Sequence, residues 1–187
     1  NAEPYYRRGL FMSNFTFGSA KVLLYEPELV MEDLTRAVQL DPNSAGAHHA
    51  LGVVFDRMGN VQQAMSEFNK AAELDPTDSR PHLYLGEKYA NSGQFQLAIS
   101  SFAKVIKVDP SNVEVLKDYA FLCLSHNQDR LWRRAKKALE LAIKIRPNDA
   151  EILMNYAYTL YLNGELQRAV EYYQRSLEIR PNWGKTH

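Results

Sequence analysis

The sequence is poor in cysteine and carries no surplus of charge. Cys123 is the only cysteine among the 187 residues, which excludes an internal disulfide framework and a zinc site built on paired thiolates. Lysine and arginine together number 22, and aspartate and glutamate also number 22. Without net charge, the chain has no overall field that would attract nucleic acid or an anionic membrane surface. We therefore expect no nucleic-acid partner.

Long hydrophobic runs are also missing. No stretch approaches the roughly 20 apolar residues that a membrane-spanning helix requires, and the first residues lack the basic-then-apolar order of a signal peptide. We expect no membrane span and favour a cytoplasmic location, with which a single cysteine is consistent. No strand pattern with a glycine-rich phosphate loop is evident, so the usual nucleotide-binding motifs are not supported.

What the sequence does contain is a repeat that proline marks. Pro42, Pro76, Pro110, Pro147 and Pro181 are separated by 34, 34, 37 and 34 residues. Each of them follows an apolar residue and then an aspartate or an arginine. Because proline cannot continue a helix and disfavours helical geometry in the residue before it, each phrase predicts the end of one helix and the start of the next.

Each repeat unit contains two helical patterns. In residues 45–57 and 61–74, small and apolar residues recur with a period near 3.6, and Gly59-Asn60 separates the two stretches. Small residues recur at Gly52, Gly86, Ala120 and Ala157 and at Ala64, Ala98, Ala135 and Ala169, and large ones at Phe68, Phe102, Leu139 and Tyr173. The small residues let two helices approach closely, and stacked hairpins bury surface that a single hairpin could not.

These residues resemble the tetratricopeptide repeat family, whose 34-residue unit carries Leu-Gly, an aromatic residue, a turn glycine, alanines and a closing proline. Nearly the whole pattern is present in residues 45–78, at His48, Leu51, Gly52, Phe55, Gly59, Ala64, Phe68, Ala71 and Pro76. The resemblance implies an all-α fold, namely a right-handed α-solenoid (superhelix) of antiparallel helix-turn-helix hairpins. Arrays of this family bind other proteins, so the resemblance implies a scaffold and not an enzyme.

The resemblance covers nearly the whole chain and divides it into units. We expect a divergent first unit at 1–44, regular units at 45–78, 79–112 and 150–183, a unit at 113–149 with three inserted residues near Asn127–Arg130, and the start of a truncated continuation at 184–187. The first unit holds an apolar insertion around 14–27. That insertion is either a lengthened helix or a loop folded back on the array, or it is an arm that contacts a partner.

The residues that could carry chemistry are few. His48 and His82 occupy the same repeat position, and no Asp, Glu or Cys stands at ligand spacing beside them, so we expect packing residues and no metal site. Cys123 takes the position of Phe55 and Tyr89, which predicts a buried apolar side chain. We therefore expect no catalytic residue and no cofactor.

Local charge is uneven. Residues 130–146 hold seven basic side chains against the single acid Glu140, and residues 26–33 hold four acids. The basic run favours a solvated outer face of the array. A patch for acidic protein or nucleic acid, and head-to-tail pairing with the acidic run, are the alternatives.

In the family, the first helix of each hairpin lines a concave groove, and its residues outside the packing pattern face the ligand. Carried onto this chain, that geometry gives the peptide-binding candidates His49, Leu83, Glu87, Lys117, Phe121, Leu124, Glu151, Met154, Tyr158, Tyr161 and Leu162. The same geometry also places Gly46, Asp56 and Glu114 in the groove. The second half of this groove is rich in aromatic and aliphatic side chains, and residues 151–162 are apolar on nearly every side, so we expect them to be covered. A partner would cover them; the alternatives are a further C-terminal segment in the groove or tighter packing of the hairpins.

One subclass of the family grips the C-terminal carboxylate of chaperones with lysine, asparagine and arginine. The corresponding positions here are His49, Val53, Tyr84, Glu114 and Asp118. Two acids stand where cations are needed, so we do not expect that specificity.

The leading hypothesis from the sequence is a scaffold or adaptor that holds an extended or helical peptide in its groove, mainly between Phe121 and Leu162. The alternative is a structural array that self-associates or docks on another domain of a larger polypeptide, which could include an enzyme domain. The last helix would then carry an association surface at Leu166, Val170, Tyr173 and Leu177. We expect a neighbouring molecule or further repeats to cover that surface.

Overall fold

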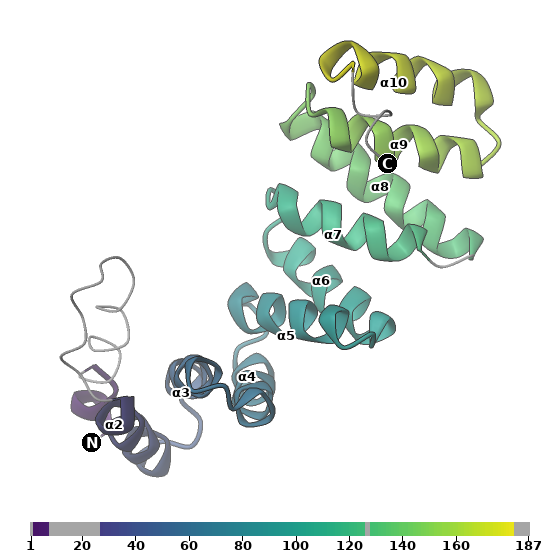
Figure 1. Cartoon of the computed structure of the whole chain (residues 1–187). Coiled ribbons are helices and arrows are strands. Elements are labelled where there is room, and N and C mark those ends of the chain that lie inside the picture. Colours follow the sequence, from purple (N-terminus) through teal and green to yellow (C-terminus); the bar gives the residue numbers. More distant parts are fainter. Residues whose placement is uncertain (1, 8–26, 126–127, 182–187) are drawn as a thin grey trace. The chain divides into compact units, whose positions relative to one another are not determined.

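The computed structural model describes residues 2–7, 27–125 and 128–181, and all regular secondary structure among them is helical (Figure 1). Residues 3–7 form a short helix. The longer helices are α2 (Pro27–Leu40), α3 (Ala45–Arg57), α4 (Val61–Leu74), α5 (Ser79–Asn91), α6 (Phe95–Val108), α7 (Val113–Leu124), α8 (Asp129–Ile145), α9 (Ala150–Leu162) and α10 (Leu166–Ile179). The expected all-α fold is confirmed.

The chain divides into two compact units, and the division falls inside α5. Unit 1 is Asn1–Leu85 and unit 2 is Gly86–His187. In unit 1, α3 packs against α4 and against α2. In unit 2, α7 packs against α8 and α9 against α10, while α6 contacts α7 and α8 contacts α9. Antiparallel hairpins that pack against their neighbours in chain order form an α-solenoid.

Short glycine turns join the two helices of a hairpin. Gly59, Gly93 and Gly164 have φ angles of 77°, 75° and 78°, a left-handed conformation that glycine adopts without strain. The residue after each glycine donates its backbone N–H to a carbonyl five positions earlier, as Asn60 does to Phe55 at 2.8 Å and Glu165 to Leu160 at 2.9 Å. The turn glycine of the repeat pattern therefore reverses the chain between helices.

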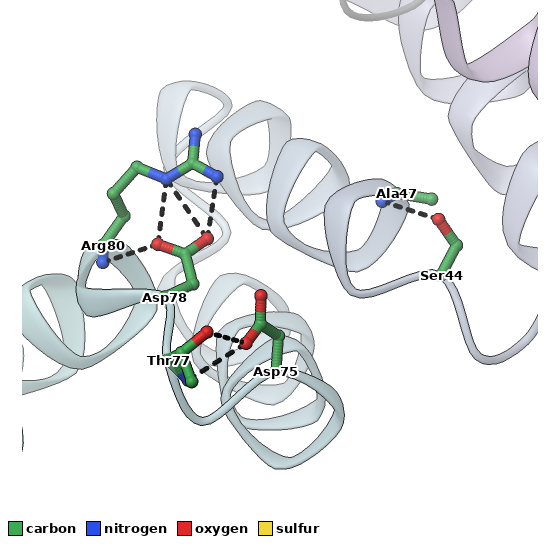
Figure 2. Close-up of polar contacts among 6 residues, drawn as sticks. All are labelled: Ser44, Ala47, Asp75, Thr77, Asp78 and Arg80. Atoms are coloured by element: carbon green, nitrogen blue, oxygen red, sulfur yellow. Dashed lines mark hydrogen bonds and ion pairs between the residues drawn. The ribbon is translucent and has the colours of Figure 1, made fainter. Parts of the chain in front are cut away.

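Aspartate side chains stabilise the links between hairpins (Figure 2). Asp75 accepts hydrogen bonds from the backbone N–H of Thr77 at 3.0 Å and from its hydroxyl at 2.6 Å. Asp78 then accepts from the backbone N–H of Arg80 at 2.9 Å, in the first turn of α5. Ser44 caps α3 in a similar way, by accepting from the N–H of Ala47. These local bonds satisfy helix N–H groups that would otherwise lack a partner.

Large and small residues interlock inside the hairpins. Gly52 faces the Phe68 ring, and a Cβ placed on Gly52 would lie 3.1 Å from ring carbons. Gly86 faces Phe102 more closely, at 2.6 Å. Both phenylalanines are almost fully buried, as are the alanines that recur with them, Ala64, Ala98, Ala135 and Ala169. The small residues of the repeat therefore make room for the aromatic rings.

The structure describes most of the region around the three-residue insertion near Asn127–Arg130, but little of the apolar insertion at 14–27. Helix α8 has 17 residues, whereas α4, α6 and α10 each have 14. The three inserted residues near Asn127–Arg130 thus correspond to a longer second helix. Most of the apolar insertion at 14–27, and all of 184–187, lie outside the described residues.

Candidate functional site

In unit 1, side chains that were expected to face a ligand are engaged within the unit. The hydroxyl of Tyr84 donates to Asp56 at 2.6 Å, and the Tyr84 ring lies over Phe68 with 4.0 Å between centroids. His49 is half-buried and meets Phe68 edge to face at 5.3 Å. Burial, helped by the charge of Arg80, lowers the pKa of His49.

Gly46 does not offer an open groove position, contrary to expectation. A Cβ on Gly46 would lie 2.5 Å from the hydroxyl oxygen of Tyr6 and 3.0 Å from the ring carbon that bears it. The short helix at residues 3–7 therefore covers this end of α3. Periodicity did not predict the contact between Tyr6 and Gly46, because the segment that follows Tyr6 departs from the repeat.

In unit 2, the first helices of the hairpins expose their large apolar residues. Phe121 on α7 is 64% exposed, and Tyr158 and Tyr161 on α9 are 43% and 56% exposed. The two tyrosine rings are stacked, with centroids 6.4 Å apart and an interplanar angle of 20°. Large apolar side chains are exposed here on two neighbouring helices of one array, which is typical of a binding surface.

A pocket of about 430 Å³ lies among these residues. It is lined by Phe121, Leu124, Ser125, Met154, Asn155, Tyr158 and Tyr173. Four of the predicted groove residues are thus brought together, from two different helices. Tyr161 stacks beside the pocket, and Leu162 is half-buried without lining it. We call the pocket together with Tyr161 the aromatic groove.

Charged residues stand on α7 one to two turns before Phe121. Lys117 contacts Glu151 and lies 3.4 Å from Glu114, while Arg146 bonds to Glu114 at 2.7 Å. Burial lowers the pKa of Lys117, but the carboxylates of Glu151 and Glu114 outweigh this effect and raise the pKa above its usual value. The hydrogen bond from Arg146 lowers the pKa of Glu114. Both cations are therefore already engaged.

Asp118 differs from its charged neighbours. Among the described residues its carboxylate makes no hydrogen bond and no ion pair. Partial desolvation of the carboxylate raises the pKa of Asp118, and the charges of Glu114 and Glu151 add to this effect against the opposing charge of Lys117. Asp118 is exposed and precedes Phe121 by one helical turn, which places an uncompensated carboxylate beside the aromatic groove.

The remaining predicted groove residues lie outside the pocket. His49 and Leu83 belong to unit 1 and are half-buried. Glu87 is exposed on the part of α5 that belongs to unit 2. A larger pocket of about 790 Å³ is lined by Tyr5 and by residues of α2. None of the predicted groove residues contributes to it.

The last helix presents a second apolar surface. Leu166, Val170 and Leu177 on α10 are 58%, 51% and 49% exposed. Tyr173, which was predicted to belong with them, is half-buried and also lines the pocket beside Tyr158. Its equivalents Phe68 and Phe102 are buried. Tyr173 therefore connects the aromatic groove with what we call the end surface, Leu166, Val170 and Leu177.

The residues with reactive groups lie in packed surroundings. Cys123 is fully buried, and burial raises the pKa of its thiol to about 11. His48 is buried, with Nδ1 2.6 Å from a carboxylate oxygen of Glu67 and Nε2 3.0 Å from the Pro42 carbonyl. Glu67 reaches His48 from α4, although no acid stands at ligand spacing beside His48 in the sequence. The two residues are 19 positions apart, so ligand spacing along one helix could not reveal the pair.

Metal-binding clusters and membrane-spanning helices are absent from the described residues. These residues contain no group of three or more His, Cys, Asp or Glu side chains placed to hold a metal ion. None of their helices is long and apolar enough to cross a membrane. The basic residues of α8 are mostly exposed, and Lys136 is bonded to Glu165.

Structures of known proteins share this fold. The crystal structure of YrrB, described as a TPR protein with an unusual peptide-binding site, superposes with a TM-score of 0.75 at 17% identity, covering 98% of this chain and 89% of YrrB. A structure of MamA gives 0.69 at 17% identity, with 98% and 96% covered, and MamA AMB-1 gives 0.72 at 15%, with 100% and 93% covered. At such identities the similarity establishes the fold alone. No curated protein matches the sequence.

Family profiles match the sequence directly. The profile described as tetratricopeptide repeat matches residues 45–78. The profile described as cytochrome c-type biogenesis protein H TPR domain matches residues 75–184, which is more than half of the chain. The hairpins, their glycine turns and their interlocked small and aromatic residues are the structural counterpart of these matches. The chain belongs to the tetratricopeptide repeat family.

Proposed function

We propose that this chain is a protein-interaction scaffold whose aromatic groove binds a peptide or helical segment of a partner. The observation that carries the proposal is the exposure of Phe121, Tyr158 and Tyr161 around a pocket of about 430 Å³. Phe121 and Tyr158 line this pocket, and Tyr161 stacks on Tyr158 beside it. Pockets of this size commonly receive ligand groups.

The chemistry of the groove suits protein binding. Tyrosine offers large contact area with few rotatable bonds, and aromatic residues are enriched among the side chains that dominate binding energy. Met154 adds an adaptable apolar wall to the pocket. Both first helices, α7 and α9, contribute residues, so a segment that lies across them contacts two hairpins at once. The peptide-binding site attributed to YrrB supports the same use of this fold.

The polar residues of the predicted groove have a secondary role in this proposal. Lys117 of α7 forms an ion pair with Glu151 of α9. Glu87 remains a predicted ligand contact in unit 2, and His49 and Leu83 remain predicted ligand contacts in unit 1. We assign the binding energy mainly to the aromatic groove, and we assign no catalytic reaction and no cofactor to the chain.

Combined replacement of Tyr158 and Tyr161 by alanine tests the proposal. Peptides of about 12 residues, selected from a random library against the chain, provide the probe, and fluorescence anisotropy gives their affinity. We expect the double variant to keep its helical circular dichroism and to lose roughly 2 kcal/mol or more of binding free energy. Phe95→Ala is the matched control, because Phe95 is a 40% exposed aromatic residue on α6, a second helix of a hairpin. If the double variant binds as tightly as the parent, the groove assignment is wrong.

A second candidate function rests on the end surface. Leu166, Val170 and Leu177 form an exposed apolar surface on α10, and such surfaces mark association sites. Self-association, or docking on another domain of the same polypeptide, would cover them. Sedimentation velocity over a range of concentrations tests this role. Val170→Lys with Leu177→Lys should reduce association, whereas Val108→Lys, at a valine that is 42% exposed on α6, should not. A parent chain that stays monomeric at every concentration would exclude self-association.

A further inference from the structure

We infer that the segment bound by the aromatic groove carries an arginine next to a large apolar residue. The inference rests on the proposed function and specifies the chemistry of its partner. Two features of unit 2 support it independently, namely the apolar pocket and the unbalanced charge beside it.

The apolar residue of the ligand is assigned to the pocket. Side chains of Phe121, Leu124, Met154, Tyr158 and Tyr173 make up most of its lining. Ser125 is already engaged, since its hydroxyl donates to the Phe121 carbonyl at 2.9 Å. A large aliphatic or aromatic side chain would remove this surface from water at about 25 cal/mol per Å², whereas a charged side chain there would lose its hydration without a partner.

The surplus negative charge beside the pocket favours a cationic group in the ligand. Around the first half of α7 stand three carboxylates, Glu114, Asp118 and Glu151, and two cations, Lys117 and Arg146, so one negative charge is left over. Both cations contact Glu114 or Glu151. Asp118 is the carboxylate without a hydrogen bond or ion pair among the described residues. An anionic segment, such as a C-terminal carboxylate, would be repelled here, and a cationic one attracted.

The neighbourhood of Asp118 favours arginine over lysine. A guanidinium can bind a carboxylate through two parallel hydrogen bonds, and its flat face stacks on aromatic rings. The groove offers both partners, because Asp118 lies one turn from Phe121 and the stacked rings of Tyr158 and Tyr161 are exposed. The side-chain amide of Asn155, which makes no hydrogen bond within the described part of the chain, can bond to the backbone of the same segment.

A peptide selection tests the inference. Random peptides of about 12 residues are selected against the parent chain and sequenced. We expect the bound peptides to be enriched in arginine within about four positions of a large apolar residue. The best peptide is then compared with its citrulline counterpart, which keeps the shape of arginine without its charge. Citrulline should weaken binding to the parent about tenfold.

Variants of the chain assign the effect to Asp118. In Asp118→Asn the arginine peptide should also bind about tenfold more weakly, and the citrulline peptide should bind almost as it does to the parent. Glu178→Gln, an exposed carboxylate change on α10, serves as control and should alter neither affinity. This pattern differs from the effect of a general loss of folding, which would lower the affinity for both peptides equally.

The outcomes separate the two proposals. If the selected peptides depend on Tyr158 and Tyr161 but show no preference for arginine, or if Asp118→Asn leaves that preference unchanged, the inference is wrong while the groove stands. If the selected peptides bind without dependence on Tyr158 and Tyr161, or if no peptide binds, both the inference and the proposed function are wrong.

Discussion

The two units use the same repeat position in opposite ways. In unit 1, Tyr84 lies over Phe68 and its hydroxyl bonds to Asp56. In unit 2, Asp118 occupies the equivalent position, 34 residues later, and the equivalent of Asp56 is Ala90, which has no polar side chain. Asp118 is therefore left without a hydrogen bond among the described residues. A repeat position can thus either stabilise the array or remain available to a ligand, depending on the residue it carries.

A second set of equivalent positions shows the same contrast. Val53 in unit 1 corresponds to Phe121 and Tyr158 in unit 2 at the repeat spacing. Val53 is half-buried, whereas Phe121 and Tyr158 are 64% and 43% exposed. The larger residues stand where the surrounding hairpins do not cover them. The comparison predicts that substitutions at these equivalent positions cost stability in unit 1 and binding in unit 2.

The largest effect is expected where the two units pack alike. Leucine at Gly86 would meet Phe102, because even a Cβ there lies 2.6 Å from the ring, and we expect a loss of about 3 kcal/mol in unfolding free energy. Alanine substitutions at the two equivalent glycines compare the space available in each unit. At Gly52, where the distance is 3.1 Å, the gain in helix propensity offsets the crowding, so Gly52→Ala should be nearly neutral and Gly86→Ala destabilising. Urea denaturation of the three variants measures these changes in unfolding free energy, and a fully stable Gly86→Leu would overturn the assigned packing.

Tyrosine substitutions test the contrast between the units directly. Tyr84→Ala removes the ring over Phe68 and leaves Asp56 without the 2.6 Å bond, so we expect a loss of about 2 kcal/mol in stability. Tyr158→Ala removes an exposed ring and should change stability by less than about 0.5 kcal/mol. Thermal unfolding of both variants measures the two losses of stability. Equal losses would show that Tyr158 has a structural role and is not reserved for a partner.

A smaller effect is expected from the unbalanced carboxylate. Partial desolvation and the charges of Glu114 and Glu151 raise the pKa of Asp118. The folded state therefore binds this proton more readily than the unfolded chain, and the ionised form lowers stability at neutral pH. Asp118→Asn should raise Tm by about 1 °C at neutral pH, and the gain should vanish near pH 3, about a unit below the usual aspartate pKa.

Glu114→Gln provides the matched control with the opposite sign. The hydrogen bond from Arg146 lowers the pKa of Glu114, so its ionised form stabilises the folded state at neutral pH. That stabilisation is lost as pH falls through the lowered pKa. Glu114→Gln should therefore lower Tm at neutral pH. Calorimetry that showed the same sign for both variants would contradict the charge balance described for α7.

Much of the fold could be predicted from the sequence, because repeated residues report repeated geometry. The predicted helices at 45–57 and 61–74 have the same bounds as α3 and α4. Proline and turn glycine act locally on the backbone, so their positions mark helix ends without knowledge of tertiary contacts. The interlocking of Gly52 with Phe68 follows from the same periodicity.

The candidate site was harder to predict, because exposure depends on what the neighbouring elements cover. Periodicity placed Tyr158 and Gly46 on the same side of their helices, but Tyr6 covers Gly46 and the described residues leave Tyr158 exposed. Tyr173 lines the pocket through contacts with residues of other helices. Glu67 reaches His48 across a hairpin. Each of these arrangements is tertiary, and no local pattern in the sequence encodes it.

Site-specific photo-crosslinking distinguishes whether unit 1 or unit 2 holds the binding surface. A photoreactive benzoylphenylalanine is placed at Phe121 of unit 2 or at the equivalent Val53 of unit 1, and each chain is irradiated with a peptide selected against the parent. We expect crosslinks from position 121 that disappear when Tyr158 and Tyr161 are replaced by alanine, and few or none from position 53. Crosslinks of equal yield from both positions, or from position 53 alone, would contradict the claim that unit 2 holds the binding surface.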